Sequence, residues 1–271
     1  LDLMKKQKII SIICIMAFLL AGCGRTVENR SEAGLPKIVI GNEDYPPFNY
    51  IDADGNFTGI TVELATEAFA RMGYQTEFSR IDWEKKTQLL ENGEIDCIWD
   101  CFPMDGWEDL YQWAGPYMVS RQMIAVLPGS DIYTLQDLEG RAVAVQSATQ
   151  PEEMFSDPEV YGLPKLKELF SLSNRELIYP FLSKGYADAI CSHETFIRQY
   201  MADYNLEYRL LEEPLLTVGL GVAFAKEDDR GLAQQLDQIL QEMREDGTTA
   251  RILTKYLGES EKYMEVDSYE Q

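Results

Sequence analysis

Positive charge is scarce in this 271-residue sequence, where 24 Lys and Arg stand against 46 Asp and Glu and the formal net charge is −22. Such a chain repels nucleic acid and anionic lipid surfaces, because it has no excess of cations to neutralise phosphates. An acidic surface mainly favours solubility, and attraction of a cationic solute is a secondary consequence. The composition therefore excludes a nucleic-acid partner, while 45% hydrophobic residues are enough to form packed cores.

Histidine and cysteine are also rare, with one His and five Cys in the sequence. A zinc site needs several such ligands close together, so we expect no metal and no cofactor. Cys97 and Cys101 lie at the end of a predicted strand, where an extended chain would separate their Cα atoms by about 13 Å, beyond disulfide reach. We expect these two residues and Cys191 to be small buried hydrophobes.

Long apolar runs are limited to Ile9–Leu20. Twelve residues rise about 18 Å as a helix, less than the roughly 30 Å of a bilayer's hydrocarbon core, so this run does not predict a membrane span. It follows a cationic start with three lysines and precedes Leu20-Ala21-Gly22-Cys23, which is the layout of a secretory signal peptide. The last four residues resemble the bacterial lipoprotein cleavage box, which implies cleavage before Cys23 and lipid on its thiol. An ordinary signal peptide, cut nearby, is the alternative.

We therefore expect a lipoprotein signal peptide at 1–22 and a polar, flexible tether at 23–36. Removing residues 1–22 takes away three Lys and one Asp, so the net charge becomes −24. The expected location is outside the cytoplasm, with the protein anchored to the cell membrane only by lipid on Cys23.

Strand and helix patterns alternate along the remaining chain. Apolar residues at helical spacing predict a helix from Val62 to Met72 that ends at Gly73. Ser173 and Glu176 fit a capping box at the start of another helix. Apolar and β-branched runs predict strands at 38–40, 76–81, 95–99, 122–127, 141–146, 187–191 and 217–225.

Two such alternating series are followed by terminal helices at 230–245 and 248–257 and by an acidic tail at 260–271, which we expect to fray. Strands that alternate with helices indicate mainly parallel sheets with helices on both faces. The fold class predicted is α/β, with two lobes.

Beyond the alternation of strands and helices, the sequence contains an ordered set of short motifs. The motifs are Tyr45-Pro46-Pro47-Phe48, Val62-Glu63-Leu64, Trp83, Gly93-Glu94-Ile95-Asp96, Gly115-Pro116-Tyr117, Leu135-x-Asp137-Leu138-x-Gly140, Val143-Ala144-Val145-Gln146-Ser147, Gly185-x-x-Asp188-Ala189 and Asp246-Gly247-Thr248. In this order and spacing the set resembles extracellular solute-binding proteins of family 3, the polar amino-acid binders of ABC importers, over about residues 37–258.

The resemblance implies a type II periplasmic-binding fold, a clamp of two lobes. Lobe 1 would comprise 37–125 and 222–259, and lobe 2 would comprise 128–218. Two hinge strands would cross between the lobes near Val126 and Gly221, and the ligand would bind between the lobes. This agrees with the rule that α/β sheets bind ligands at the carboxyl ends of their strands.

The same resemblance implies a set of ligand-binding residues. Trp83 matches an aromatic residue that stacks on the ligand, and Tyr45 matches a second wall, although core packing would also explain both. The turn that contains Ser147, Thr149 and Gln150 matches a loop whose backbone N–H groups and hydroxyl receive a carboxylate at a helix N-terminus. Simple helix capping would use the same three residues.

Three positions depart from the family pattern. Trp107 or Glu108 stands where the family has an Arg that clamps the ligand carboxylate, and neither can replace its fork of donors. His193, followed by Glu194, stands where the family has an Asp for the ammonium. Asp100 replaces a small hydroxyl residue and could bind the ammonium, or could simply cap the strand end. We therefore expect a ligand with an exposed positive charge and a weakly held carboxylate, or none.

The function implied is binding, not catalysis. A monomer would capture a small polar solute, an amino acid or a related amine-bearing compound, and deliver it to an ABC permease in the membrane. A cyclohexadienyl-dehydratase-like enzyme is one alternative on the same fold, with Glu194 or Asp100 as the acid that protonates the leaving group. A stand-alone sensory ligand-binding module is another.

Overall fold

The structure is a computed structural model that describes residues 34–266. The expected signal peptide at 1–22, the expected lipid site Cys23, most of the tether and residues 267–271 of the tail lie outside the described residues. Within 34–266, no helix is both long enough and apolar enough to cross a membrane.

The first part of the chain alternates strands and helices as the sequence predicts. Its elements are β1 (Lys37–Asn42), β2 (Tyr50–Ile51), β3 (Phe57–Thr58), α2 (Ile60–Arg71), β4 (Gln75–Arg80), η1 (Trp83–Lys85), α3 (Lys86–Glu91) and β5 (Cys97–Ile98). The helix α2 stops at the predicted Gly73, whose φ of 83° suits glycine and whose N–H bonds to the carbonyl of Ala70. Cys97 and Cys101 are free and buried, as expected.

The second part continues the alternation. Its elements are β6 (Tyr111–Val126), η2 (Leu135–Leu138), β7 (Ala142–Gln146), α4 (Gln150–Ser156), α5 (Pro158–Tyr161), β8 (Glu168–Leu172), η3 (Arg175–Leu177), α6 (Ile178–Ser183), β9 (Ala189–His193), α7 (Glu194–Tyr204), β10 (Arg209–Leu210) and β11 (Leu216–Ala225). The helical start after β8 is capped by Asn174, whose side chain accepts from the N–H of Glu176 at 2.9 Å, and not by the predicted Ser173.

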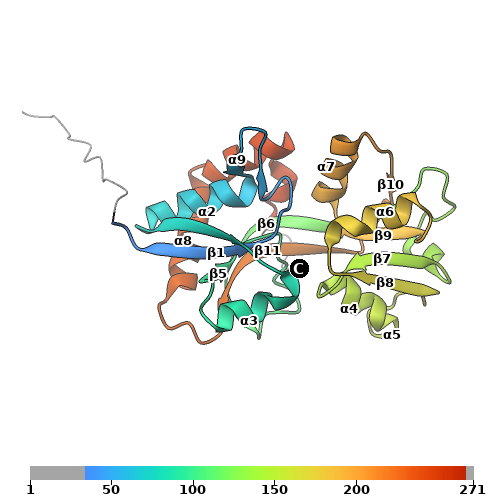
Figure 1. Ribbon diagram of the computed structural model, residues 1–271, viewed down its shortest axis with the longest axis horizontal. Helices are drawn as coiled ribbons and strands as arrows, with labels where there is room; N and C mark the ends of the chain where they lie inside the picture. Colours follow the sequence, from blue (N-terminus) through green and yellow to red (C-terminus); the bar gives the residue numbers. More distant parts are fainter. Residues whose placement is uncertain (1–33, 267–271) are drawn as a thin grey trace, which may run out of the picture. The chain divides into compact units, whose positions relative to one another are not determined.

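The strands form one sheet in the order β4-β1-β5-β11-β6-β9-β7-β8, with β10 on β6, and β2 and β3 form a separate hairpin. Parallel pairing joins β1 to β4 and β5, and separately joins β7 to β8 and β9. These parallel groups form lobe 1 and lobe 2, and both place their carboxyl ends toward the junction between them (Figure 1). The two-lobed α/β fold is therefore confirmed.

β6 and β11 connect the two lobes. They pair antiparallel from Leu216 with Gln122 to Ala225 with Tyr111, and an irregularity in the register falls between Leu220 and Val222. In lobe 1, β11 also pairs with β5, whereas in lobe 2 the end of β6 pairs with β9. The ribbon shows both strands running from the group around β1 to the group around β7 (Figure 1). Val126 is the last residue of β6 and pairs with Ala189.

Gly221 occupies the irregularity between these strands, in very little space. A Cβ atom at this position would lie 2.6 Å from Cγ of Met104 and 2.8 Å from Cε3 of Trp113. Real Cβ contacts are longer than this, so a larger residue would force Met104 or Trp113 to move. The glycine therefore allows the crossing strands to pack closely against the loop after β5.

The chain returns to lobe 1 through α8 (Leu232–Glu245) and α9 (Thr248–Leu257), close to the predicted terminal helices. The helix α8 packs against β6, β11 and α2. The short helix η4 (Glu261–Tyr263) then packs against β6, and Tyr263 and Val266 are buried. The first residues of the tail are thus held by apolar contacts, where the sequence alone predicts fraying.

Candidate functional site

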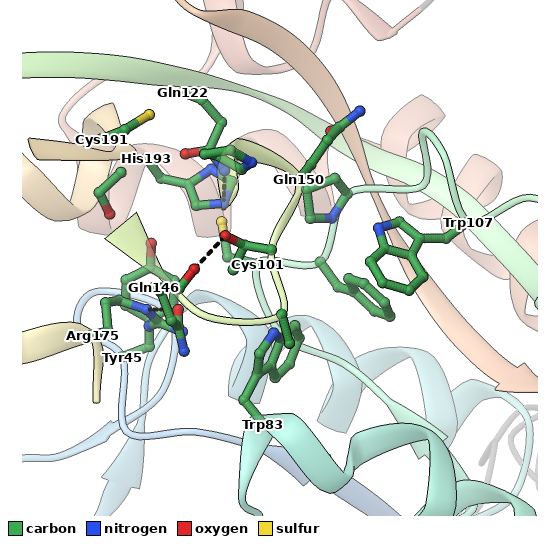
Figure 2. Close-up of a pocket in the computed structure, with 16 residues that line it drawn as sticks. Tyr45, Trp83, Cys101, Trp107, Gln122, Gln146, Gln150, Arg175, Cys191 and His193 are labelled. Carbon is green, nitrogen blue, oxygen red and sulfur yellow. Dashed lines mark hydrogen bonds between the residues drawn. The ribbon is translucent and has the colours of Figure 1, made fainter. Parts of the chain in front are cut away.

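A cavity of about 500 Å³, counting space that opens to solvent, lies where the carboxyl ends of the two parallel groups meet. Lobe 1 contributes residues after β1, after β4 and after β5. Lobe 2 contributes the end of β7 and the turn after it, a residue after β8 and the last three residues of β9, and β6 contributes Gln122. Figure 2 shows the lining side chains. The lining includes Tyr45, Trp83, Cys101, Phe102, Trp107, Gln122, Gln146, Thr149, Gln150, Arg175, Cys191, Ser192 and His193. This mixture of aromatic and polar groups suits a small polar molecule.

Six of the nine ligand-binding residues expected from the sequence line this cavity: Tyr45, Trp83, Trp107, Thr149, Gln150 and His193. The other three, Asp100, Ser147 and Glu194, do not appear in its lining and have partners elsewhere. The cavity thus gathers residues that are up to 148 positions apart in the sequence, from Tyr45 to His193.

Three aromatic rings form one wall. The ring of Phe102 lies 5.1 Å from that of Trp83 and 5.9 Å from that of Trp107, measured between centroids. The ammonium of Lys86 lies 4.7 Å from the Trp83 ring centroid and 5.2 Å from that of Trp107, in cation–π contact with both. Burial lowers the pKa of Lys86 to about 8, although the neighbouring Glu43 and Glu84 carboxylates oppose the shift.

Tyr45 forms part of the opposite wall. Its side chain is 1% exposed, and its ring meets that of Phe196 edge-on with centroids 4.4 Å apart. The guanidinium carbon of Arg175 lies 3.3 Å from the Tyr45 ring centroid. Tyr45 is therefore both a packed core residue and a support for a buried cation.

Arg175 is the most important cavity residue that the sequence does not indicate. Its Nη2 donates to Oε2 of Glu43 at 2.5 Å, and its Nε donates to Oε1 of Gln146 at 2.9 Å. Burial alone would lower the pKa of Arg175, but the neighbouring Tyr45, Glu43 and Asp100 raise it above its ordinary value. Arg175 is consequently a permanent positive charge in the cavity wall.

The place of Arg175 in the sequence explains why sequence patterns do not identify it as a cavity residue. An Arg one residue after the helix cap Asn174 is ordinarily a solvated side chain. The preceding strand β8 lies at the edge of the sheet, paired only with β7, and its short sequence gives no clear strand pattern. Recognition of β8 would have placed Arg175 at the carboxyl end of a parallel strand, where α/β folds hold their ligands.

His193 ends β9 and is uncharged. Its Nε2 lies 2.9 Å from Nε2 of Gln122, which can only donate, and its Nδ1 lies 2.8 Å from the hydroxyl of Ser120. With the Gln122 amide in this orientation, Nε2 accepts and Nδ1 carries the proton. Burial, reinforced by the positive charge of Arg175, lowers the pKa of His193 to about 3. A neutral imidazole cannot replace the carboxylate that binds an ammonium in the family pattern.

Asp100 is fully buried beneath the cavity and holds the loop after β5. Its carboxylate accepts from the backbone N–H groups of Glu43 and Cys101 at 2.8 and 2.7 Å and from Nδ2 of Asn49 at 3.0 Å. Burial raises its pKa to about 6, since desolvation outweighs these hydrogen bonds and the charge of Arg175. Its contacts match the alternative in which Asp100 caps the strand end.

The turn before α4 is occupied by its own hydrogen bonds. Thr149 donates its hydroxyl to the carbonyl of Gln146 at 2.7 Å, and the N–H of Ala148 donates to Oε2 of Glu152 at 2.6 Å. Ser147 reaches across to lobe 1, where its hydroxyl donates to Oε1 of Glu84 at 2.6 Å. A carboxylate of the protein itself, Glu152, thus already lies at the helix start where a ligand carboxylate was expected.

Glu194 begins α7 and points away from the cavity lining. It forms ion pairs with Arg121, on β6, and with Arg198, one turn further along α7. Desolvation would raise the pKa of Glu194, but hydrogen bonds from Arg198 and Arg121 outweigh it and hold the pKa below its ordinary value. The two arginines therefore fix Glu194 as a charged anchor for α7.

Several buried polar atoms of the cavity lining have no hydrogen-bond partner among residues 34–266. They are Nε1 of Trp83, an N–H donor, the hydroxyl of Tyr45, which can donate or accept, and the side-chain oxygens of Gln122 and Gln150, which are acceptors. Buried polar groups are nearly always paired, and leaving one unpaired costs about 1–3 kcal/mol. A bound solute that supplied two donors and one acceptor would satisfy Trp83, Gln122 and Gln150, and a further polar group would satisfy the Tyr45 hydroxyl.

The charges of the lining differ from the expectation. Among the lining side chains that the structure describes, Arg175 alone carries a full charge at neutral pH, because His193 is neutral. Asp100 and Glu194, the carboxylates expected to make the cavity anionic, do not line it. A separate, more open cavity is lined by other carboxylates, Glu43, Asp44, Asp82, Glu84 and Glu176, together with Arg80 and Arg175. Residues 34–266 contain no cluster of His, Cys, Asp and Glu suited to a metal ion.

Known proteins match this chain over most of its length. A model of the bacterial extracellular solute-binding proteins, family 3, matches residues 38–259. The arginine-binding extracellular protein ArtP of Bacillus subtilis (strain 168) is 26% identical over 258 residues, which cover 93% of this chain and 98% of that protein.

Solved structures agree with the fold. The crystal structure of Tv2483 bound to L-arginine matches with a TM-score of 0.75 and 26% identity, over 82% of this chain and 91% of that one. The ancestral amino acid-binding protein AncCDT-1, described as a precursor of cyclohexadienyl dehydratase, matches with a TM-score of 0.70 and 25% identity, over 81% and 95%.

Proposed function

This chain belongs to the bacterial extracellular solute-binding proteins, family 3, and on that premise we propose that it captures a small polar, amino-acid-like solute between its two lobes for an ABC importer. One observation carries the proposal. Both lobes line a single cavity in which buried donors and acceptors lack partners among the described residues. Relatives that bind arginine, such as ArtP and Tv2483, support amino acids as the starting class of solute.

The contacts of the solute are part of this proposal. We place it against Tyr45, Trp83, Trp107, Thr149, Gln150 and His193, the expected residues that line the cavity. Asp100, Ser147 and Glu194 would act indirectly, because their side chains bond the loop after β5, Glu84 and two arginines respectively.

Capture would work as a two-state hinge. The lobes touch through bonds that only the closed arrangement allows: Ser147 with Glu84, the ammonium of Lys86 with the carbonyl of Ala148 at 3.3 Å, and Arg175 with Glu43. A solute that contacts both walls is bound fully only in this arrangement, so it shifts the population toward closure. β6 and β11, the strands common to both lobes, would bend during this change. The permease would then recognise the closed form.

Anchoring at the membrane is a further part of the proposal. The signal-peptide pattern at 1–22 and the cleavage box at Cys23 support a lipoprotein that is held on the extracytoplasmic side by lipid and a short tether, and that acts as a monomer. Detergent phase partitioning in a bacterial host would test this. The wild type is expected in the detergent phase and Cys23→Ser in the aqueous phase, and equal partitioning would contradict it.

An enzyme of the dehydratase class is the second candidate, because AncCDT-1 is among the structural matches. Dehydration needs an acid that protonates the leaving group. The described lining contains no carboxyl group, and His193, with a pKa of about 3, holds no transferable extra proton at neutral pH. Binding is therefore the better proposal. Release of phenylpyruvate from prephenate, or of phenylalanine from arogenate, by the purified protein would overturn it.

The solute itself can be identified directly. Mass spectrometry of material released on denaturing the purified protein should reveal a small polar compound in near-stoichiometric amount. Adding that compound back should raise the melting temperature, because a ligand bound only by the folded state stabilises it. A protein that carries nothing and is stabilised by no member of a broad polar-metabolite panel would contradict the proposed function.

A further inference from the structure

The charges of the cavity indicate which part of a solute is recognised, and this inference rests on the proposed function. Arg175 is the charged side chain of the described lining, and no carboxylate accompanies it there. Its Nη2 and Nε bond Glu43 and Gln146, while its Nη1 has no hydrogen bond to any described residue. The guanidinium, stacked on Tyr45, is therefore fixed in place and retains free donors.

The other charged groups near the cavity are already engaged. The ammonium of Lys86 lies among the rings of Trp83, Phe102 and Trp107 and contacts the carbonyls of Trp83 and Ala148. A cationic group of the solute placed against these rings would be repelled by Lys86, so the aromatic wall does not act as a cage for ammonium.

The helix start at α4 is not available for a carboxylate either. The N–H of Ala148 bonds the carboxylate of Glu152, and the hydroxyl of Thr149 is donated to a carbonyl. A second anion beside Glu152 would be repelled. This leaves Arg175 as the group with both the charge and the free donors to bind a carboxylate.

The unpaired acceptors of the cavity are uncharged. The side-chain oxygens of Gln122 and Gln150 can accept from an amine or from a hydroxyl, and a carboxylate partner for an ammonium is missing from the described lining. Arg175 and Gln150 lie on opposite sides of the view of the cavity (Figure 2). An anionic group at one side and a neutral hydrogen-bond donor at the other would fit this arrangement.

We propose that Arg175 is the carboxylate anchor of this cavity and that uncharged acceptors receive the remaining polar group of the solute, so that an ammonium is not needed for binding. The solute class is a compact carboxylic acid with an apolar or aromatic side chain, with or without an α-amino group. The site is therefore expected to bind a 2-hydroxy acid about as well as the corresponding amino acid.

Matched trios of probes test the proposal on the unaltered protein. Each trio shares one side chain and comprises an amino acid, its 2-hydroxy acid and its decarboxylated amine, for example L-phenylalanine, L-3-phenyllactate and phenethylamine, with further trios for leucine, valine, methionine, tyrosine and tryptophan. For the trio that binds most tightly, calorimetry should give dissociation constants within tenfold for the two acids and at least tenfold weaker binding of the amine. An amine that binds within tenfold of its acid, or no binding by any acid, overturns the proposal.

Variants separate an anchor from a merely structural role. Arg175→Gln should weaken acid binding at least tenfold, whereas the control Arg141→Gln, which removes an exposed lobe 2 cation paired with Asp131, should not. Glu43→Gln removes the charge partner of Arg175 but keeps the guanidinium, so it should weaken acid binding less than Arg175→Gln does. If Glu43→Gln weakens binding as much as Arg175→Gln does, the Glu43–Arg175 contact matters only as a link between lobes and the proposal fails.

Failure of this inference differs from failure of the proposed function. A co-purified solute without a carboxylate, bound between the lobes, would overturn the role of Arg175 and leave the solute-binding function intact. Absence of any bound or stabilising small molecule would contradict both.

Discussion

The carboxylate of Glu43, which follows β1 in lobe 1, accepts a hydrogen bond from Nη2 of Arg175 in lobe 2 at 2.5 Å. Both side chains are mostly buried, 18% and 10% exposed respectively, so each charge depends on the other for compensation. Separation of the lobes would expose both charges to water, where each is solvated. The pair therefore makes closure compatible with burial of an arginine, because Glu43 compensates the charge of Arg175.

Trp83 should contribute to binding through both its ring and its N–H group. Trp83→Phe keeps most of the ring but loses the unpaired Nε1 donor, so we expect solute affinity to fall about three- to tenfold. Trp99→Phe is the matched control, because Trp99 is also buried with an unpaired Nε1 but does not line the cavity. Calorimetric titration of both variants with the identified solute checks this, and equal losses of affinity would contradict the role of Trp83.

His193 should make the protein sensitive to acid. Its pKa of about 3 in the folded protein lies below its ordinary value of 6.5, so between these values the unfolded state binds a proton that the folded state does not. Stability should therefore fall as the pH falls from about 6.5 toward 3. His193→Gln can still form hydrogen bonds with Ser120 and Gln122. Between pH 6 and pH 4 its free energy of unfolding should fall by about 2 kcal/mol less than that of the wild type.

Urea unfolding of both proteins at pH 6, 5 and 4 gives the difference. Asp100 has the opposite slope, because its raised pKa of about 6 stabilises the protein below that pH, but this contribution is common to both proteins and cancels. An identical loss of stability in wild type and His193→Gln would show that His193 is not the group responsible.

Glu194 should affect stability and not affinity. Glu194→Gln removes the charge that Arg121 and Arg198 bind at the start of α7. Because both arginines are partly exposed and can be solvated, we expect a loss of only about 1–2 kcal/mol in unfolding free energy. Solute affinity should stay within twofold of the wild-type value. A tenfold loss of affinity in a variant that still folds would show that Glu194 contributes to solute binding.

Gly221 should be intolerant of a side chain. Gly221→Ala would place a methyl group 2.6 Å from Met104 and 2.8 Å from Trp113, and the forced rearrangement should cost about 1–3 kcal/mol of stability. Gly129→Ala is the control, because a Cβ there would meet no atom within 4 Å and its φ is not positive. Equal melting temperatures for Gly221→Ala and Gly129→Ala would contradict tight packing at the crossing strands.

Much of the fold could be predicted because its signals are local. The helix that ends at Gly73 and the terminal helices that end before Gly247 and Gly258 depend on apolar spacing and on glycine at helix ends, both readable from a few neighbouring residues. β8 lacked such a signal, because a short edge strand that is not fully buried need not have a run of apolar residues.

The site was harder because its contacts are not local. Three expected site residues are next in sequence to residues that line the cavity, but their own side chains point elsewhere. Asp100 bonds Asn49, Ser147 bonds Glu84 and Glu194 pairs with Arg121. Arg175 looks solvated in the sequence and becomes buried only when β8 pairs with β7 and Glu43 lies opposite. These partners are 51 to 132 residues apart in the sequence, so they cannot be inferred from spacing.

The most direct measurement is a crystal structure of the protein with the tightest-binding member of the acid panel. We predict that the solute lies between the lobes, with its ring or apolar group against Trp83 and Trp107 and its carboxylate on the guanidinium of Arg175. A solute bound outside this cavity, or one whose carboxylate points away from Arg175, would contradict the account.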